Sequence, residues 1–315
     1  MRKALLAAII VTLFSLAGPL WAQNSTLPLK SGSVRFAVIG DMGTGDPAQY
    51  EVAETMARLR QKFPFDFVIT LGDNIYGGKS PKDFDRKFGT PYKSLIDAGV
   101  KFYASLGNHD ETAETFYKPF NMNGHRYYTF KMGDVHFFAL DSNYMDPDQL
   151  NWLANELKTA GKGWKIPFFH HPLYSSARAH GSSIELRKVL EPLFADGSVQ
   201  VVFSGHDHVY ERIKPQKGIA YFVEGASGEL RRGDLESAAF EATGFDQDRT
   251  FMLVEIAGDQ MFFEAISRTG TVVDSGIISA TGAPSPSTAL QPQAEPLPIS
   301  IPVPAALSLR REVSR

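Results

Sequence analysis

Residues 201–212 read VVFSGHDHVYER, an apolar run that ends in a glycine and then in two histidines flanking an aspartate. The run VVFS is typical of a buried strand, because it is short, rich in β-branched and aromatic residues, and bounded by glycine. Imidazole nitrogens and carboxylate oxygens at a strand end are candidate metal ligands. Two histidines alone do not make a metal site, so the rest of the chain must supply further candidate ligands.

Four further apolar runs end in the same way. The side chains in question are Asp41 after VRFAVIG (34–40), Asp73, Asn74 and Tyr76 after DFVITLG (66–72), Asn108, His109 and Asp110 after KFYASLG (101–107), and His170 and His171 at the end of WKIPFFH (164–170). In open α/β sheets, ligands bind at the carboxyl ends of the strands. We therefore expect these side chains to converge on one site.

Helix-like stretches separate the strand-like ones in the first part of the chain. Apolar spacing predicts helices over 47–63, 148–160 and 183–195, and further strands over 136–141 and 199–205. The last part is mostly strands and turns, predicted over 221–226, 250–256, 260–266 and 271–278. This order predicts an α/β core followed by a strand-rich half.

The two ends of the chain differ from the middle in composition. Residues 1–22 carry two cations, a short apolar run and a small residue before Gln23, which predicts a secretory signal peptide, with an uncleaved anchor as the alternative. We expect a linker over 23–33, one domain over 34–280 and a proline-rich disordered tail over 281–315. No second apolar span follows, so we expect a secreted or periplasmic protein without a stable membrane span.

The composition restricts both ligands and partners. The chain has 315 residues, no cysteine and a net charge of -3, so a metal site must use nitrogen and oxygen ligands. No basic patch indicates a nucleic-acid partner.

The candidate ligands together suit a pair of cations, because they include imidazoles, carboxylates, an amide and a phenol. Two cations about 3.5 Å apart clamp the attacking and leaving oxygens of a phosphoryl displacement. His125 and His136 stand apart from these groups and are read as structural.

Five blocks carry a resemblance to a known family. They are GDMG (40–43), GDNIY (72–76), GNHD (107–110), HHP (170–172) and GHDH (205–208). In this order they resemble the calcineurin-like metallophosphoesterases, and the tyrosine of GDNIY with the continuation HVYER resembles the small, tartrate-resistant type of purple acid phosphatase. The resemblance spans 34–278 and implies a four-layer α/β/β/α sandwich with two mixed β-sheets.

The resemblance implies a role for each matching residue. A first metal, ferric in this family, would be bound by Asp41, Tyr76 and His208, and a second metal, which could be iron, zinc or manganese, by Asn108, His170 and His206. Asp73 would bridge the two. The histidine of the fourth block stands two residues before proline, which selects His170 over His171.

Three further residues are assigned by the same resemblance. His109 would act at the phosphate as a proton donor or oxyanion stabiliser, and Asp110 would orient His109 or a neighbouring amide. His180 precedes a glycine, one residue later than in the family pattern, and would help to protonate the leaving alcohol; a solvent-exposed loop histidine is the alternative. Asp207 and Glu211 are read as structural.

The implied function is that of an exported acid phosphatase with two metal ions. A hydroxide held by the ferric ion would attack a phosphomonoester in line, and we expect a monomer acting on small phosphate esters. One alternative is a phosphodiesterase or nucleotidase on the same site, because the motifs define the metals and not the second substituent of the substrate. The other is a non-catalytic metal-binding or redox protein.

Overall fold

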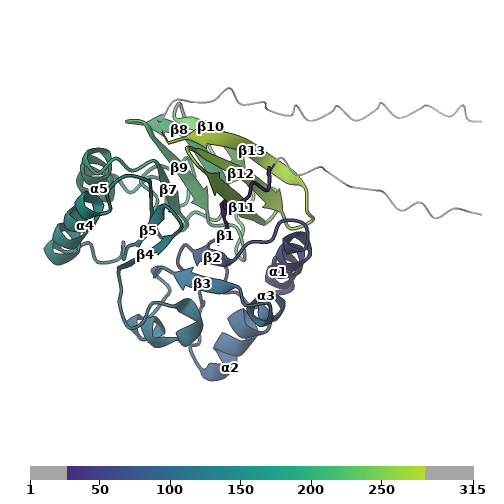
Figure 1. Cartoon of the computed structure of the whole chain (residues 1–315). Helices are drawn as coiled ribbons and strands as arrows, with labels where there is room; N and C mark the ends of the chain where they lie inside the picture. The colour runs from purple at the N-terminus through teal and green to yellow at the C-terminus, as the bar shows by residue number, and fades with distance from the viewer. Residues whose placement is uncertain (1–26, 281–315) are drawn as a thin grey trace, which may run out of the picture.

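Two β-sheets pack face to face, and helices cover their outer faces (Figure 1). The computed structural model describes residues 27–280, so the predicted signal peptide and tail lie outside the described residues. Three separate hydrophobic clusters fill the spaces between the layers. The expected four-layer α/β/β/α sandwich is confirmed.

The first sheet has six strands in the order β13-β12-β11-β1-β2-β3. Its strands are β1 (Val34–Ile39), β2 (Phe67–Thr70), β3 (Lys101–Ala104), β11 (Thr250–Ala257), β12 (Gln260–Ser267) and β13 (Val272–Ser279). Strands β1, β2 and β3 run parallel, whereas β11, β12 and β13 each pair antiparallel with their neighbours. The sheet is therefore mixed.

The second sheet has seven strands in the order β10-β8-β9-β7-β6-β5-β4. Its strands are β4 (Tyr128–Met132), β5 (Val135–Ala139), β6 (Trp164–Phe169), β7 (Val201–Ser204), β8 (Tyr210–Gln216), β9 (Ile219–Glu224) and β10 (Glu241–Phe245). Strands β5, β6, β7 and β9 are parallel, and the others pair antiparallel with their neighbours. The carboxyl ends of its central strands carry the later sequence blocks.

Helices lie on both outer faces. They are α1 (Pro47–Arg60), α2 (Pro81–Phe84), α3 (Lys93–Asp97), α4 (Pro147–Thr159) and α5 (Ile184–Asp196), with a π-helix η1 (Asp85–Gly89) and 3₁₀ turns η2 (Thr112–Phe116) and η3 (Lys118–Phe120). Helices α1 and α3 pack on the first sheet, and α4 and α5 on the second. Helix α4 starts where Asp146 accepts a hydrogen bond from the Gln149 amide at 2.8 Å, an N-cap followed by proline.

Strand β1 shows how one apolar run serves two interfaces. Phe36 and Val38 face the second sheet, where the Phe36 ring lies 5.2 Å from that of Phe137, while Ala37 and Ile39 face the helices. Successive side chains of a strand point to opposite faces, so a strand buried on both sides must be apolar throughout. The central strands read as unbroken apolar runs for this reason.

Some elements differ from the sequence expectation. Residues 81–97 form the short helical segments α2, η1 and α3, where no helix was predicted, and β4, β8 and β10 are additional strands. The described end of the predicted linker lies against β11, because the amides of Leu29 and Lys30 donate to Glu255 at 2.8 and 2.5 Å. Among residues 27–280, the helices are too short or too polar to cross a membrane.

Candidate metal centre

The polar side chains at five strand ends meet where the two sheets come together. Asp41 follows β1, Asp73 follows β2 and Asn108 follows β3 of the first sheet, while His170 follows β6 and His206 follows β7 of the second. Cross-sheet hydrogen bonds hold these ends together: the His206 amide donates to Asp41 Oδ2 at 2.8 Å, and His170 Nδ1 bonds the Leu71 carbonyl at 2.9 Å. The convergence expected from the sequence is present.

Three ligand positions have a left-handed backbone. Asp41, Asp73 and His206 have φ values of 52°, 49° and 71°. A residue other than glycine in this region is strained by about 1–3 kcal/mol and clusters at functional sites. The preceding glycines allow close approach, since a Cβ at Gly205 would lie 2.5 Å from Asp41 Oδ2. The fold therefore tolerates local strain to aim these three side chains at one point.

One group of donors consists of Asp41, Tyr76 and His208. The Tyr76 hydroxyl lies 3.2 Å from Asp41 Oδ1 and 3.3 Å from His208 Nε2, and His208 Nε2 lies 3.4 Å from Asp41 Oδ1. A carboxylate oxygen, a phenol oxygen and an imidazole nitrogen thus face one another at nearly equal distances. This hard and borderline donor set suits iron or another transition metal.

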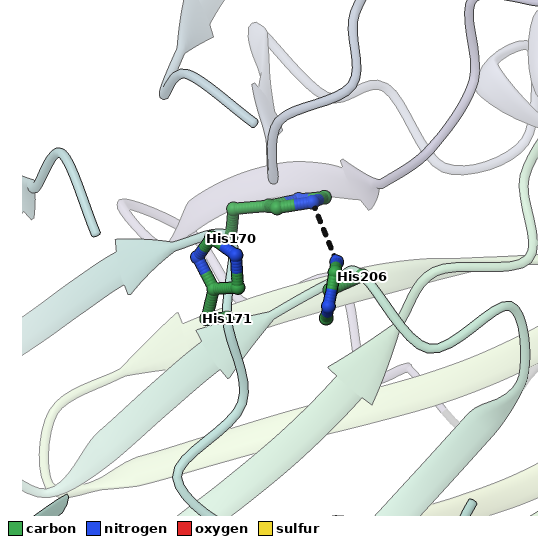
Figure 2. Close-up of side chains that lie close together, drawn as sticks. All are labelled: His170, His171 and His206. Carbon is green, nitrogen blue, oxygen red and sulfur yellow. Dashed lines mark hydrogen bonds between the residues drawn. The ribbon is translucent and has the colours of Figure 1, made fainter. Parts of the chain in front are cut away.

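A second group consists of Asn108, His170 and His206. The Leu71 carbonyl can only accept, so His170 carries its proton on Nδ1 and directs the lone pair of Nε2 into the site. This Nε2 lies 2.9 Å from Asn108 Oδ1. It also lies 3.1 Å from His206 Nδ1, the contact that the dashed line marks in Figure 2. With the His170 proton on Nδ1, the lone pairs of His170 Nε2 and Asn108 Oδ1 face each other and repel unless a cation lies between them, so these donors fit a bound metal ion.

Asp73 lies between the two groups. Its Oδ2 is 3.5 Å from His170 Nε2, and its Oδ1 accepts a hydrogen bond from the His109 amide at 2.8 Å. Ligand atoms of Asp41, Asp73 and His170 all lie within 4.8 Å of one another. A carboxylate in this position can reach cations on both sides.

Burial sets the charge state of these side chains. Burial and then the charge of Asp73 raise the pKa of Asp41, and burial with the same carboxylates raises the pKa of Tyr76 far above its ordinary value. Burial lowers the pKa of His170, and burial with neighbouring imidazoles lowers that of His206 to about 2. Buried carboxylates beside neutral imidazoles leave a deficit of positive charge, which bound cations would offset.

The candidate catalytic histidines flank the two groups. The His109 side chain is exposed, and its ring lies 5.0 Å from that of Tyr76. The exposed His180 ring lies against the His206 ring, tilted by 31° with the ring centroids 4.1 Å apart. Burial and then the charge of Arg231 lower the pKa of His180. Both rings therefore lie at the solvent side of the centre, where a substrate has access.

Asp110 and the carboxylates of the last block hold the surrounding loops. Asp110 accepts hydrogen bonds from the amides of Asn74 and Gly107, each at 2.8 Å, and so ties the loop after β2 to the loop after β3. Asp207 accepts from the Gly181 amide at 3.2 Å, and Glu211 accepts from the Ser176 amide at 2.9 Å. In GHDHVYER, the histidines face the centre while the acids hold the loop that carries His180.

The structure brings in residues that the sequence did not single out. His171, passed over in favour of His170, bonds Ser142 Oγ at 2.8 Å and lies 4.5 Å from the His206 ring. Arg231 lies beside His208, whose carbonyl accepts from the Arg231 amide at 3.0 Å. An arginine in a loop gives no sequence signal of its own, and only the fold places it beside His208.

A cleft of about 820 Å³ opens beside the second group of donors. It is lined by Leu106, Gly107, Asn108, Asp110, Glu111, Thr112, Asp141, Ser142, Asn143, Tyr144, His171, Ser183, Ile184, Glu185 and Leu186. Asn108 and His171 connect the cleft to the centre. The cleft is large enough for a small organic group next to the donors.

Known proteins are similar to this chain in sequence and in fold. Purple acid phosphatase 17 of Arabidopsis thaliana is 29% identical over 68% of this chain and 74% of that protein, and tartrate-resistant acid phosphatase type 5 of Mus musculus is 26% identical over 62% and 73%. A solved purple acid phosphatase from yellow lupin (Lupinus luteus) seeds superposes with a TM-score of 0.67 at 18% identity, over 84% of this chain and 58% of that chain. The resemblance to purple acid phosphatases is confirmed.

The same fold also occurs in a protein that is not named as a phosphatase. The anchor in the inner membrane complex of Plasmodium has a TM-score of 0.67 at 20% identity, over 78% of this chain and 89% of that one. This likeness concerns the fold alone. Residues 34–210, which include all five sequence blocks, match the family model of the calcineurin-like phosphoesterases. The chain belongs to the calcineurin-like phosphoesterase family.

Proposed function

We propose that this chain is an exported acid phosphatase that uses two metal ions to hydrolyse small phosphomonoesters. The observation that supports this most directly is the meeting of two donor groups at the buried Asp73, with Asp41 and His170 within 4.8 Å. The purple acid phosphatases among its relatives support the same reaction. Its expected monomeric state stays a prediction.

The two donor groups define two candidate metal positions. Asp41, Tyr76 and His208 would hold the first ion, which we propose is ferric; Asn108, His170 and His206 would hold iron, zinc or manganese, and Asp73 would contact both. When bound, such ions polarise phosphoryl oxygens and acidify water. The protein contributes a buried, strained and hydrogen-bonded frame that holds the donors in place.

The residues around the two metal positions would bind the substrate and supply protons. The His109 ring beside Tyr76 would donate to a phosphoryl oxygen, and the His180 ring beside His206 would protonate the leaving alcohol. The cleft between residues 106–112 and 141–144 would receive the alcohol portion. Asp110 keeps the loops that carry Asp73 and His109 together.

A combined measurement tests the proposal. Metal content and the visible spectrum of the purified full chain are recorded with turnover of p-nitrophenyl phosphate and bis-(p-nitrophenyl) phosphate across pH. Two metals including iron, a purple band, an acid optimum and a preference for the monoester are expected. Faster cleavage of the diester would assign a phosphodiesterase instead, and bound metal without hydrolysis would assign a metal-binding or redox protein.

Replacement of Tyr76 by phenylalanine should bleach the visible band. The colour arises from charge transfer between a phenolate and a ferric ion, and phenylalanine removes the only tyrosine oxygen in the first donor group. Activity should fall less than on loss of Asp73, because the carboxylate and imidazole donors remain. Absorption spectra of this variant are compared with those of Tyr92→Phe. Tyr92 is a buried tyrosine in the hydrophobic cluster between the first sheet and its helices. A purple Tyr76→Phe protein would refute the ligand assignment.

Replacement of His180 by alanine should slow esters with poor leaving groups most. A general acid contributes about 10²–10⁴-fold when the leaving oxygen needs a proton, and little for p-nitrophenolate. Rates for β-glycerophosphate and p-nitrophenyl phosphate are compared in His180→Ala and in His125→Ala, an exposed histidine outside the centre. Equal losses on both esters would contradict an acid role for His180.

A further inference from the structure

Arg231 belongs to a backbone segment that is fixed to the first donor group. Residues 225–231 follow β9 and run along the loops that carry Asp41 and His208. The Glu229 amide donates to the Asp41 carbonyl and the Arg231 amide donates to the His208 carbonyl, each at 3.0 Å. Gly228 allows this close approach, since a Cβ there would lie 2.3 Å from the Met42 carbonyl oxygen. The start of the Arg231 side chain is thus fixed beside His208.

Among the described residues, the guanidinium group of Arg231 has no partner of opposite charge. Within residues 27–280, its buried Nη1 makes no hydrogen bond, and the group takes part in no ion pair. A buried donor on a charged group is costly when it is left unsatisfied. Native structures pair such groups with protein, water or an ion. An anion is therefore the expected partner.

The position of the guanidinium indicates where that anion binds. The Arg231 amide is bonded to the carbonyl of His208, and the His208 ring nitrogen lies 3.4 Å from Asp41 Oδ1 in the first donor group. The exposed His180 ring lies against His206 of the second group. The guanidinium, unpaired within residues 27–280, therefore belongs to the edge of the first donor group, where a phosphoryl group would meet the centre.

We propose that Arg231 is a substrate-contacting residue whose guanidinium binds a non-bridging oxygen of the phosphoryl group held at the metal centre. This inference rests on the proposed phosphatase function. Arginine suits the task because its planar N–H donors match phosphate oxygens and its charge persists at every working pH. His109 approaches from beside Tyr76, so Arg231 supplies donors from the His208 side.

Two adjacent arginines allow a matched test. Arg231→Gln and Arg232→Gln remove one charge each, but the Arg232 side chain is exposed. Binding of inorganic phosphate to the metal-loaded full chain is measured by calorimetry, together with KM and kcat for p-nitrophenyl phosphate and metal content. Loss of a charged hydrogen bond should weaken phosphate binding about tenfold or more in Arg231→Gln. Arg232→Gln should stay within about twofold, and Arg231→Lys should recover part of the loss.

The outcomes separate this inference from the proposed function. Equal phosphate affinity in the Arg231→Gln and Arg232→Gln proteins would overturn the role of Arg231 while hydrolysis by the unaltered protein persists. Absence of hydrolysis by the unaltered protein, with phosphate binding that depends on Arg231, would overturn the phosphatase but support the anion contact. If Arg231→Gln leaves phosphate affinity unchanged but lowers the unfolding temperature, Arg231 makes a structural contact instead. The buried Asp234 is a candidate for that contact, because its Oδ2 also lacks a partner within residues 27–280.

Discussion

Replacement of Asp73 by asparagine should abolish metal pairing and reduce phosphatase activity by more than about 100-fold, since even loss of a group that only orients a ligand costs about 10–100-fold. Asp73 is the carboxylate between the two donor groups, with Oδ2 3.5 Å from His170 Nε2. Asparagine keeps the shape but removes the charge and one anionic oxygen. Metal analysis and p-nitrophenyl phosphate turnover measure both losses.

The same variant has an opposite effect on the metal-free protein. The charge of Asp73 raises the pKa of the buried Asp41, so these carboxylates repel when no cation is bound. Asp73→Asn should therefore raise the free energy of unfolding of the metal-free chain while removing the stabilisation that metals provide. Asp46→Asn, an exposed aspartate after the same strand as Asp41, serves as the control. Retention of two metals and full activity in Asp73→Asn would contradict the placement of Asp73 between the two ions.

Removal of the metals should be the largest single perturbation of stability. A ligand that binds only the folded state stabilises it by about 4 kcal/mol at 1,000 times its dissociation constant, and two sites add their effects. Without cations, the buried Asp41 and Asp73 lose their counter-charges, and the left-handed backbone at both residues is no longer compensated by metal binding. Activity should vanish together with the lost stability.

Urea unfolding of the full chain before and after treatment with a chelator and a reductant measures this effect. Readdition of iron with zinc or manganese should restore both the unfolding midpoint and turnover. The Arg232→Gln protein, altered outside the donor groups, should respond to chelation as the unaltered chain does. An unfolding midpoint that is the same with and without metals would mean that the two donor groups bind no ion in the folded state.

The sequence predicted the central strands and the main helices because their patterns are strong. Helix α4 was expected over 148–160 and lies at Pro147–Thr159, since proline, an aspartate cap and apolar spacing mark it. The segment from α2 to α3 escaped prediction because its helices are four or five residues long, too short to show a period. Strand β4 was missed because it is an outer strand with alternating exposure rather than an apolar run.

The candidate centre was predictable to the extent that its residues stand at strand ends. The spacing to Pro172 favoured His170 over His171, and this choice stays a prediction: His170 is buried against the Leu71 carbonyl and His171 bonds Ser142, but ligand atoms of His170, His171 and His206 lie within 4.8 Å of one another. Arg231 and the cleft could not be predicted, because they arise from loops that only the packed sheets bring together. Patterns along the chain identify ligands but not the contacts between distant loops.

The hydrogen bond from the His206 amide to Asp41 joins residues 165 positions apart, and the donors come from the ends of strands in both sheets. Contacts of such large sequence separation form slowly, because a long loop must close before they stabilise the chain. A pair of neighbouring histidines could capture a cation in an unfolded segment, but this set of donors cannot assemble before both sheets have docked. We therefore expect metal uptake to be a late event on the folding route, so that its time course would measure the completion of folding.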